Sequence, residues 1–168
     1  MSSPSDDLRI PKIPVTVRLA IEGQGMASVK VFVAEHLADS MRRQRVLDLL
    51  ESERLFFPAL DQHSSPRIIN KATVKWVEIS LLDGALPVEE EVIDSTLYDV
   101  CRTVVVELVG GDELTGDLLY SPPPERARVV DYLNSGGRFL RLWNPERVLL
   151  VNKDRIISVR EDEQAQEA

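Results

Sequence analysis

Cysteine and histidine are nearly missing from this 168-residue chain, which contains one Cys and two His. A single cysteine, Cys101, excludes an internal disulfide framework. Together with His36 and His63 it provides too few ligands for an ordinary zinc site. No apolar run approaches the ~18 residues of a membrane-spanning helix, and residues 1–7 lack the basic start and apolar core of a secretory signal. We therefore expect a cytoplasmic protein with no cofactor, no metal and no membrane partner.

The net charge of −8 is concentrated in a connector and at the chain ends. Residues 83–100 carry six acidic side chains and no basic one, and residues 161–168 carry four acidic side chains and no basic one. An acidic tail of this kind is typical of a solvated, disordered end, although it could instead dock onto a basic partner. We expect an acidic connector at 83–100 and disordered ends at 1–7 and 161–168.

The most informative pattern is an internal repeat. Arg45–Ser52 (RVLDLLES) and Arg128–Ser135 (RVVDYLNS) are identical at five of eight positions. Further matches follow in the same order along the chain, and upstream a run of β-branched residues before a glycine turn is shared as well. They are Phe56 with Phe139, Asn70-Lys71 with Asn152-Lys153, Val77 with Val159, and Val15–Ile21 with Thr103–Val109. The order predicts a tandem duplication, with repeat 1 at 10–82 and repeat 2 at 101–160.

Each repeat follows one coarse plan. Apolar residues alternate with polar ones in the first run, which predicts a half-buried strand, and a glycine turn leads to a second strand. A helix follows, near 36–52 in repeat 1 and near 125–134 in repeat 2. Two strands close each unit, at 55–60 and 68–80 or at 138–143 and 148–160. The fold class is therefore α+β and mostly β. It consists of a duplicated ββαββ unit, each copy a small bent antiparallel sheet or an SH3/Sm-like barrel with one helix.

Three segments of repeat 2 carry a family resemblance: Arg128–Asn134, Arg138–Leu142 and Val151–Ile156. Together they resemble a bacterial domain family of unknown function, whose pattern is an Arg-x-x-Asp-x-Leu-Asn helix end, a Phe-Leu-x-Leu strand and a Val-Asn-Lys strand. Repeat 1 departs from this pattern at Glu51 and at Phe57-Pro58. The resemblance implies a bacterial cytosolic source and a compact β-rich fold, and it transfers no activity.

Several polar motifs have a structural and a functional interpretation. Arg45 with Asp48, and the equivalent Arg128 with Asp131, fit surface ion pairs better than a recognition pair. The Asn-Lys pairs fit turns better than an anion site, since no glycine-rich phosphate loop accompanies them. Cys101 is interpreted as a small core residue rather than a nucleophile.

The two repeats differ at positions where a contact surface could have developed. Trp76 aligns with Ser158, and Trp143 aligns with Leu60. Tryptophan is favoured in interface hot spots, so we expect Trp76, Phe139, Arg141 and Trp143 to form an interaction surface. The alternative for Trp76 is that it fills a larger core in repeat 1.

The sequence favours a non-enzymatic binding or scaffold module that acts through protein–protein contact or self-association. One alternative is a small-barrel nucleic-acid-binding protein, because arginines lie among aromatics near Phe139 and Trp143. The near-neutral repeats make nucleic acid the less favoured partner. Another alternative is a small-ligand sensor or enzyme with a cleft between the repeats.

Overall fold

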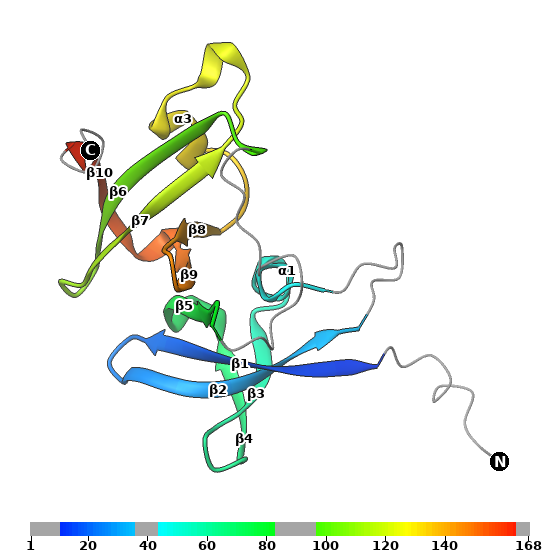
Figure 1. The fold of residues 1–168 in the computed structure, drawn as a ribbon. Helices are drawn as coiled ribbons and strands as arrows, with labels where there is room; N and C mark the ends of the chain where they lie inside the picture. Colours follow the sequence, from blue (N-terminus) through cyan, green and yellow to red (C-terminus); the bar gives the residue numbers. More distant parts are fainter. Residues whose placement is uncertain (1–10, 36–43, 83–96, 164–168) are drawn as a thin grey trace.

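The computed structural model describes residues 11–35, 44–82 and 97–163. Most of these residues belong to one antiparallel sheet, and no helix among them is long and apolar enough to cross a membrane (Figure 1). The sheet has ten strands: β1 (Lys12–Ile21), β2 (Gly25–Ala34), β3 (Phe56–Leu60), β4 (Pro66–Asn70), β5 (Val74–Ser80), β6 (Val100–Leu108), β7 (Glu113–Tyr120), β8 (Phe139–Trp143), β9 (Arg147–Asn152) and β10 (Ile156–Glu161). The expectation of a mostly β fold is confirmed.

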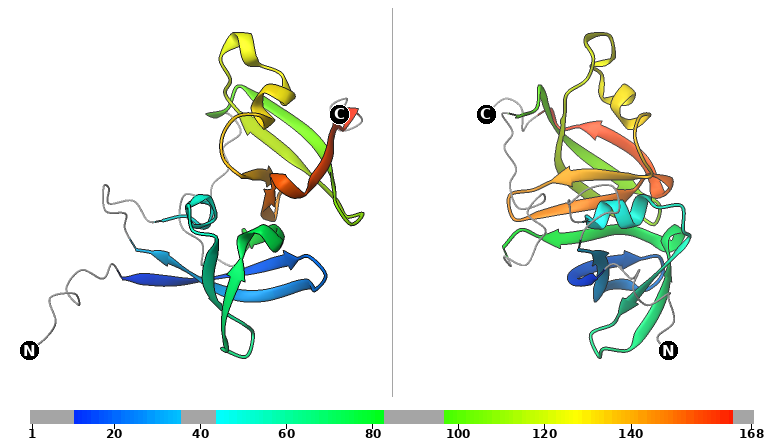
Figure 2. Two further views of the ribbon diagram at one scale, coloured as in Figure 1. Left: turned by 180° about the vertical axis from the view of Figure 1, so that it is seen from behind. Right: turned by 90° about the vertical axis from the view of Figure 1, so that its right-hand side faces the viewer.

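The strand order divides the sheet into two halves of the same plan. The first half runs β5-β1-β2-β3-β4 and the second runs β10-β6-β7-β8-β9. Strand β9 pairs with β5 and so joins the halves into one sheet. In both views of Figure 2 the halves lie one above the other, with β5 and β9 side by side between them. Among the described strands the sheet is open, with β4 and β10 at its outer edges.

Strand β1 shows the predicted period of two. Val15, Val17 and Leu19 are buried, while Thr16 and Arg18 between them are exposed. The turn to β2 contains Gly23 and Gly25 at φ of 79° and 72°, a conformation that side-chain-bearing residues seldom adopt.

The ladders correct one detail of the repeat alignment. Leu19 faces Val77 in the first half, and Val106 faces Val159 in the second. Leu19 therefore corresponds to Val106, whereas the sequence match had placed it opposite Glu107. The shift turns the apolar side chains of both first strands to the same face of the sheet. We call positions equivalent when they occupy matching places in these ladders.

The helices are shorter than predicted. Helix α1 spans Val46–Glu51, and Arg45 before it is extended because its N–H donates to the Asp48 carboxylate at 2.9 Å. Residues 36–43, the first part of the expected helix, lie outside the described residues. In the second half Pro124–Arg126 forms a separate 3₁₀ turn, and Arg128 is again extended. Helix α3 therefore covers only Val129–Leu133 of the expected 125–134.

Each half contains five strands where four were predicted. The expected strands 68–80 and 148–160 are each interrupted by a 3₁₀ turn, η1 (Lys71–Thr73) and η4 (Lys153–Arg155). The side chains of Asn70 and Asn152 cause the interruption, since each accepts a hydrogen bond of 3.0 Å from the N–H two residues on. Glu161, expected in a disordered tail, is the last residue of β10. Residues 1–7 and 164–168 lie outside the described part of the chain.

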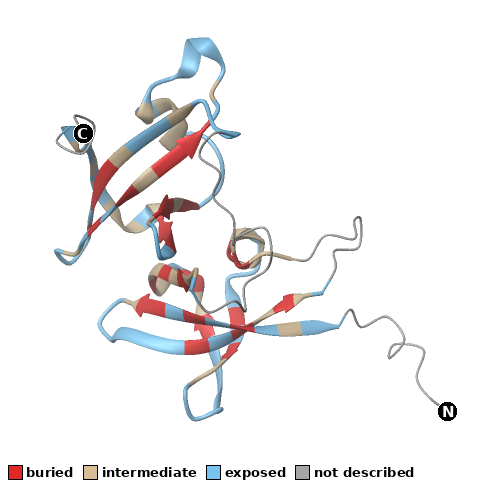
Figure 3. Cartoon of the chain, viewed as in Figure 1, coloured by how far each residue is buried: buried red, intermediate tan, exposed pale blue. Residues whose placement is uncertain are grey.

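Two hydrophobic clusters stabilise the molecule, and the β8–β9 hairpin contributes to both. One face of the hairpin belongs to the cluster of its own half, through Leu140, Leu142, Leu149 and Val151. The other face joins the cluster of the first half, through Phe139, Trp143, Val148 and Leu150. Figure 3 shows buried segments within each half and also at β5, β8 and β9, where the halves meet. The second half therefore completes the core of the first.

Candidate functional site: the junction between the halves

The junction, meaning the contacts between residues 11–82 and 97–163, is built around the β5–β9 ladder. Five residue pairs form it, from Trp76 opposite Val151 to Ser80 opposite Arg147. Because adjacent side chains on a strand point to opposite faces, the ladder supplies both clusters at once. Val77 and Leu150 face the first cluster, while Trp76 and Val151 face the second.

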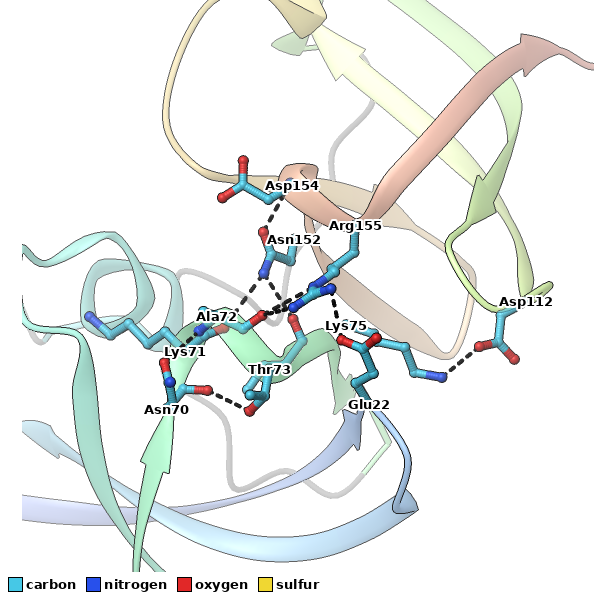
Figure 4. Close-up of polar contacts among 11 residues, drawn as sticks. Glu22, Asn70, Lys71, Ala72, Thr73, Lys75, Asp112, Asn152, Asp154 and Arg155 are labelled. Carbon is cyan, nitrogen blue, oxygen red and sulfur yellow. Dashed lines mark hydrogen bonds and ion pairs between the residues drawn. The ribbon is translucent and has the colours of Figure 1, made fainter.

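Asn152 is the buried polar residue at the centre of the junction (Figure 4). Its Oδ1 accepts from the Asp154 N–H at 3.0 Å, which forms the cap of η4. Its Nδ2 donates to the Val74 carbonyl at 3.0 Å and to the Lys71 carbonyl at 3.5 Å, both in the other half. One side chain therefore shapes its own turn and binds the opposite half.

Charged side chains hold the turns of the two halves together (Figure 4). Arg155 donates to the Ala72 carbonyl from Nη2 at 2.8 Å and from Nε at 3.1 Å, and it pairs with Glu22 at 2.7 Å. Lys75 forms a 2.6 Å ion pair with Asp112 of the β6–β7 turn. Both basic side chains are mostly shielded from solvent, so these pairs are screened less than ordinary surface pairs.

Helix α1 adds a further contact through Glu51. The two oxygens of this carboxylate accept the N–H groups of Arg138 and Phe139, each at 2.8 Å. Gly137 makes the approach possible, because a Cβ at this position would overlap the Glu51 carboxylate. Comparison of the two repeats identifies Glu51 only as a departure from the shared pattern. Its role could not be predicted there, because its partner Phe139 lies 88 residues away in the sequence.

The four predicted interaction residues all lie at this junction. Trp76 packs against the cluster of the second half, so its side chain reaches out of its own half. Phe139 and Trp143 are only 5% and 6% exposed and pack against the cluster of the first half. The Arg141 guanidinium lies 5.3 Å from the centre of the Trp143 ring. The structure places the four residues at the junction but not in one contact, because Trp76 packs on the second cluster while Phe139 and Trp143 pack on the first. Their use by a separate partner stays a prediction.

The Asn-Lys pairs have structural roles in the turns. Lys71 Nζ donates to the carbonyl and hydroxyl oxygens of Ser52, at 3.0 and 2.7 Å. The equivalent Lys153 Nζ donates to the carbonyls of Leu133 and Ser135, at 2.9 and 2.8 Å. Each lysine thereby binds the C-terminal end of the helix in its own half. Burial lowers the pKa of both ammonium groups.

A cavity of about 530 Å³ opens at the junction beside α1 and β8. Tyr120 and Tyr132 line it with their rings stacked at 4.4 Å, and the Tyr120 hydroxyl donates to the Ala127 carbonyl at 3.2 Å. Burial raises the pKa of both phenols. Tyr98 and Arg141 also line the cavity, so it offers aromatic faces and a cation to a small ligand.

Metal and nucleophile chemistry receive no geometric support from the described residues. In that part of the chain no three His, Cys, Asp or Glu side chains come together as a metal site would require. Cys101, interpreted from the sequence as a core residue, is exposed in β6. The pKa of its thiol is raised, mainly because neighbouring atoms partly desolvate the sulfur and then by the charge of Asp117, and a raised pKa disfavours the reactive thiolate.

A sequence signal for the junction was present. Val148–Val151 is an unbroken apolar run, which is typical of a strand buried on both faces. The equivalent strand β4 is interrupted by Arg67 and is mostly exposed. No family model matches the chain, and comparison with curated proteins and with solved structures found no match.

Proposed function

We propose that this protein is a non-enzymatic assembly module, formed by tandem duplication of one β-rich unit, that acts through protein–protein contact or self-association. The duplication is supported by equivalent ladders in the two halves. It is supported also by the matching contacts of Lys71 with Ser52 and of Lys153 with Leu133 and Ser135. Matching lysine contacts of this kind are expected when a fold is duplicated. They stabilise the fold and do not bring catalytic groups together in a pocket.

The observation that carries the proposal is the state of the two sheet edges. Strands β4 and β10 have one strand neighbour each among the described strands. Ile68 of β4 is 79% exposed and Ile157 of β10 is 59% exposed. Open strand edges with exposed apolar side chains favour pairing with another polypeptide. The SH3/Sm-like barrel stays a prediction, because in the described ladders neither half closes on itself.

Site-specific photo-crosslinking in the native cell tests the proposal. A photoreactive p-benzoylphenylalanine replaces Ile68 in one protein and Ile157 in another. The control carries it at Thr115, an exposed position of the interior strand β7. We expect adducts with another polypeptide, either this chain or a different one, at positions 68 and 157 and few at 115. Equal labelling at all three positions, or none, would contradict an edge-binding function.

The junction cavity supports a second candidate function, small-ligand binding. Its lining by Tyr98, Tyr120, Tyr132 and Arg141 suits a flat, anionic or polar molecule. A panel of metabolites can be screened for a rise in the melting temperature of the protein. A metabolite that raises the melting temperature of the native chain, but not that of a Tyr132→Ala protein, would favour this function. Nucleic acid has less support here, since the rings of Phe139 and Trp143 are buried and unavailable for base stacking.

A further inference from the structure

Each end of the ten-stranded sheet carries exposed apolar side chains, which are about half of those exposed among the described residues. Leu55, Phe56 and Ile68 lie at the β4 end, and Val130 and Ile157 lie at the β10 end. Figure 3 shows β4 largely exposed and α3 of intermediate burial, in contrast to the junction. Each end therefore presents an apolar surface beside an open strand edge, which is the arrangement of an interface lacking its partner.

The β4 end repeats the surface that β8 and β9 bury inside the molecule. Phe56 is equivalent to Phe139, since they face Asn70 and Asn152 in matching ladders. By the same ladders Ile68 is equivalent to Leu150. Phe139 and Leu150 are 5% and 0% exposed against the first half, whereas Phe56 is 53% exposed. The β4 end thus carries the docking surface of the junction with nothing described against it.

The β10 end repeats the surface that receives this docking. In the first half Leu47 of α1 packs on the cluster that contains Phe139 and Leu150. Its equivalent in α3, Val130, is half exposed and borders a groove of about 420 Å³ between α3 and β10. The groove is lined by Val129, Val130, Leu133, Ile156, Ile157, Ser158, Val159 and Glu161. It occupies the place that the β8–β9 hairpin fills in the first half.

We propose that a second copy of this chain fills the groove, with β4 of one molecule pairing with β10 of the next in the register of β9 on β5. Ile68 then faces Val159 and Ile69 faces Ser158, as Leu150 faces Val77 and Val151 faces Trp76. The Asn70 amide donates to the Ile156 carbonyl of the next molecule, as Asn152 does to Val74. This inference rests on the proposed function and names its partner.

The proposed contact is heterologous, because two different surfaces meet. Such a contact leaves one free end on every added molecule, so it builds a closed ring or an open filament rather than a symmetric dimer. The rotation and translation that relate one molecule to the next are then those that relate the first half of the chain to the second. The assembly would therefore continue one sheet through successive chains.

Sequence differences between the two halves make the proposed β4–β10 contact weaker than the β5–β9 contact. Asn134 stands where the two carboxylate oxygens of Glu51 each accept a backbone N–H. An asparagine amide has only one accepting oxygen, because its nitrogen donates, so this two-oxygen contact is not reproduced. Arg67 would face Arg160, where Leu149 faces Glu78. These arginines already pair with Asp61 and Glu113, at 3.2 and 3.7 Å. We therefore expect a reversible association that depends on protein concentration.

Sedimentation velocity of the purified full chain over a micromolar-to-millimolar series tests the proposal. Ile68→Asp damages only the β4 end, and Ile157→Asp damages only the β10 end; Thr115→Asp is the matched exposed control. The native chain and the control should form species that grow with concentration. Each of the other two variants should stay monomeric alone, and an equimolar mixture of them should form a heterodimer that grows no further.

Three outcomes would overturn the inference: a native chain that stays monomeric throughout, variants that associate like the native chain, or a mixture that forms no heterodimer. Fold is checked by circular dichroism, and a variant that misfolds is replaced by Phe56→Ser or Val130→Ser at the same end. A monomeric native chain whose positions 68 and 157 still crosslink to another protein in the cell would reject the second copy and leave the proposed function standing. If the native chain stays monomeric and positions 68 and 157 form no crosslinks, both the second-copy inference and the proposed function are rejected.

Discussion

At the residue scale, two equivalent asparagines, Asn70 and Asn152, lie in different environments. Asn70 and Asn152 each cap a 3₁₀ turn through Oδ1, at 3.0 Å in both halves. Only Asn152 is fully buried, and its Nδ2 also donates to Val74 of the other half. Asn152 therefore has a second role at the junction, beyond the turn cap that both residues form. Comparing substitutions at the two positions therefore separates the stability that comes from the turn cap from the stability that comes from the hydrogen bonds between the halves.

Asn152→Asp keeps the capping oxygen and removes the amide donor. The Val74 carbonyl then loses its partner and a carboxylate is buried beside it, which should lower the free energy of unfolding by about 1–3 kcal/mol. Asn70→Asp, at the equivalent position, keeps its cap and should cost much less. Urea denaturation of dilute protein measures both. Equal losses in the two variants would show that the hydrogen bonds from Asn152 Nδ2 to the other half add no stability.

At the scale of elements, the strand β5 is the piece that joins the two cores. Val77 and Ile79 belong to the first cluster, while Trp76 packs on the second. Ser158, equivalent to Trp76, is exposed on the outer strand β10. A tryptophan is thus present where the sheet continues into another half, and a serine where it ends.

Trp76→Ser should loosen the second cluster and the β5–β9 ladder while both halves keep their strands. Because the side chain is partly buried, we expect a loss of about 2–4 kcal/mol in unfolding free energy. Ser158→Ala, on the exposed outer strand, should change stability by less than about 0.5 kcal/mol. Hydrogen exchange should rise in β9 and β10 and stay unchanged in β2 and β3. Complete unfolding by the substitution, or faster exchange spread evenly over both halves, would place Trp76 in a core of its own half.

Local sequence patterns predicted part of these elements. The alternation in Val15–Ile21 gives strand β1, and the Arg-x-x-Asp motif marks the start of each short helix, because Asp48 and Asp131 both bond to the arginine before the helix. The Asn-Lys pairs predicted the turns at η1 and η4. They did not predict that each turn divides one expected strand into two, since a three-residue turn hardly disturbs a period-two pattern. Periodicity also carries no information on which distant strands pair, so β5 beside β9 could not be derived.

The candidate site was predicted as a set of residues and not as a place. Comparing the repeats selected Trp76 and Trp143, because a large side chain that replaces a small one changes a contact. The structure locates both at the junction between the halves. Polar partners such as Arg155 were missed, because Arg155 bonds to a backbone carbonyl, which every residue possesses. The apolar groove between α3 and β10 depends on packing that no local pattern encodes.

At the scale of the whole molecule, the chain contains one junction and two open sheet edges, which in our proposal are the two sides of a second junction. The junction joins β5 to β9, and the open edges are the outer strands β4 and β10. The central claim is therefore a register: β4 pairs with β10 of the next molecule as β9 pairs with β5.

Disulfide trapping measures that register most directly. In a Cys101→Ser background, which removes the one native thiol, one protein carries Ile68→Cys and a second carries Val159→Cys. Directly opposed strand residues bring their Cβ atoms to about 4.5–5.5 Å, close enough for a disulfide after small adjustments. Mixing the two under mild oxidation should give a covalent heterodimer, and replacing Val159→Cys by Thr115→Cys should abolish it. A heterodimer yield no higher than with the position 115 control would contradict head-to-tail pairing of β4 with β10.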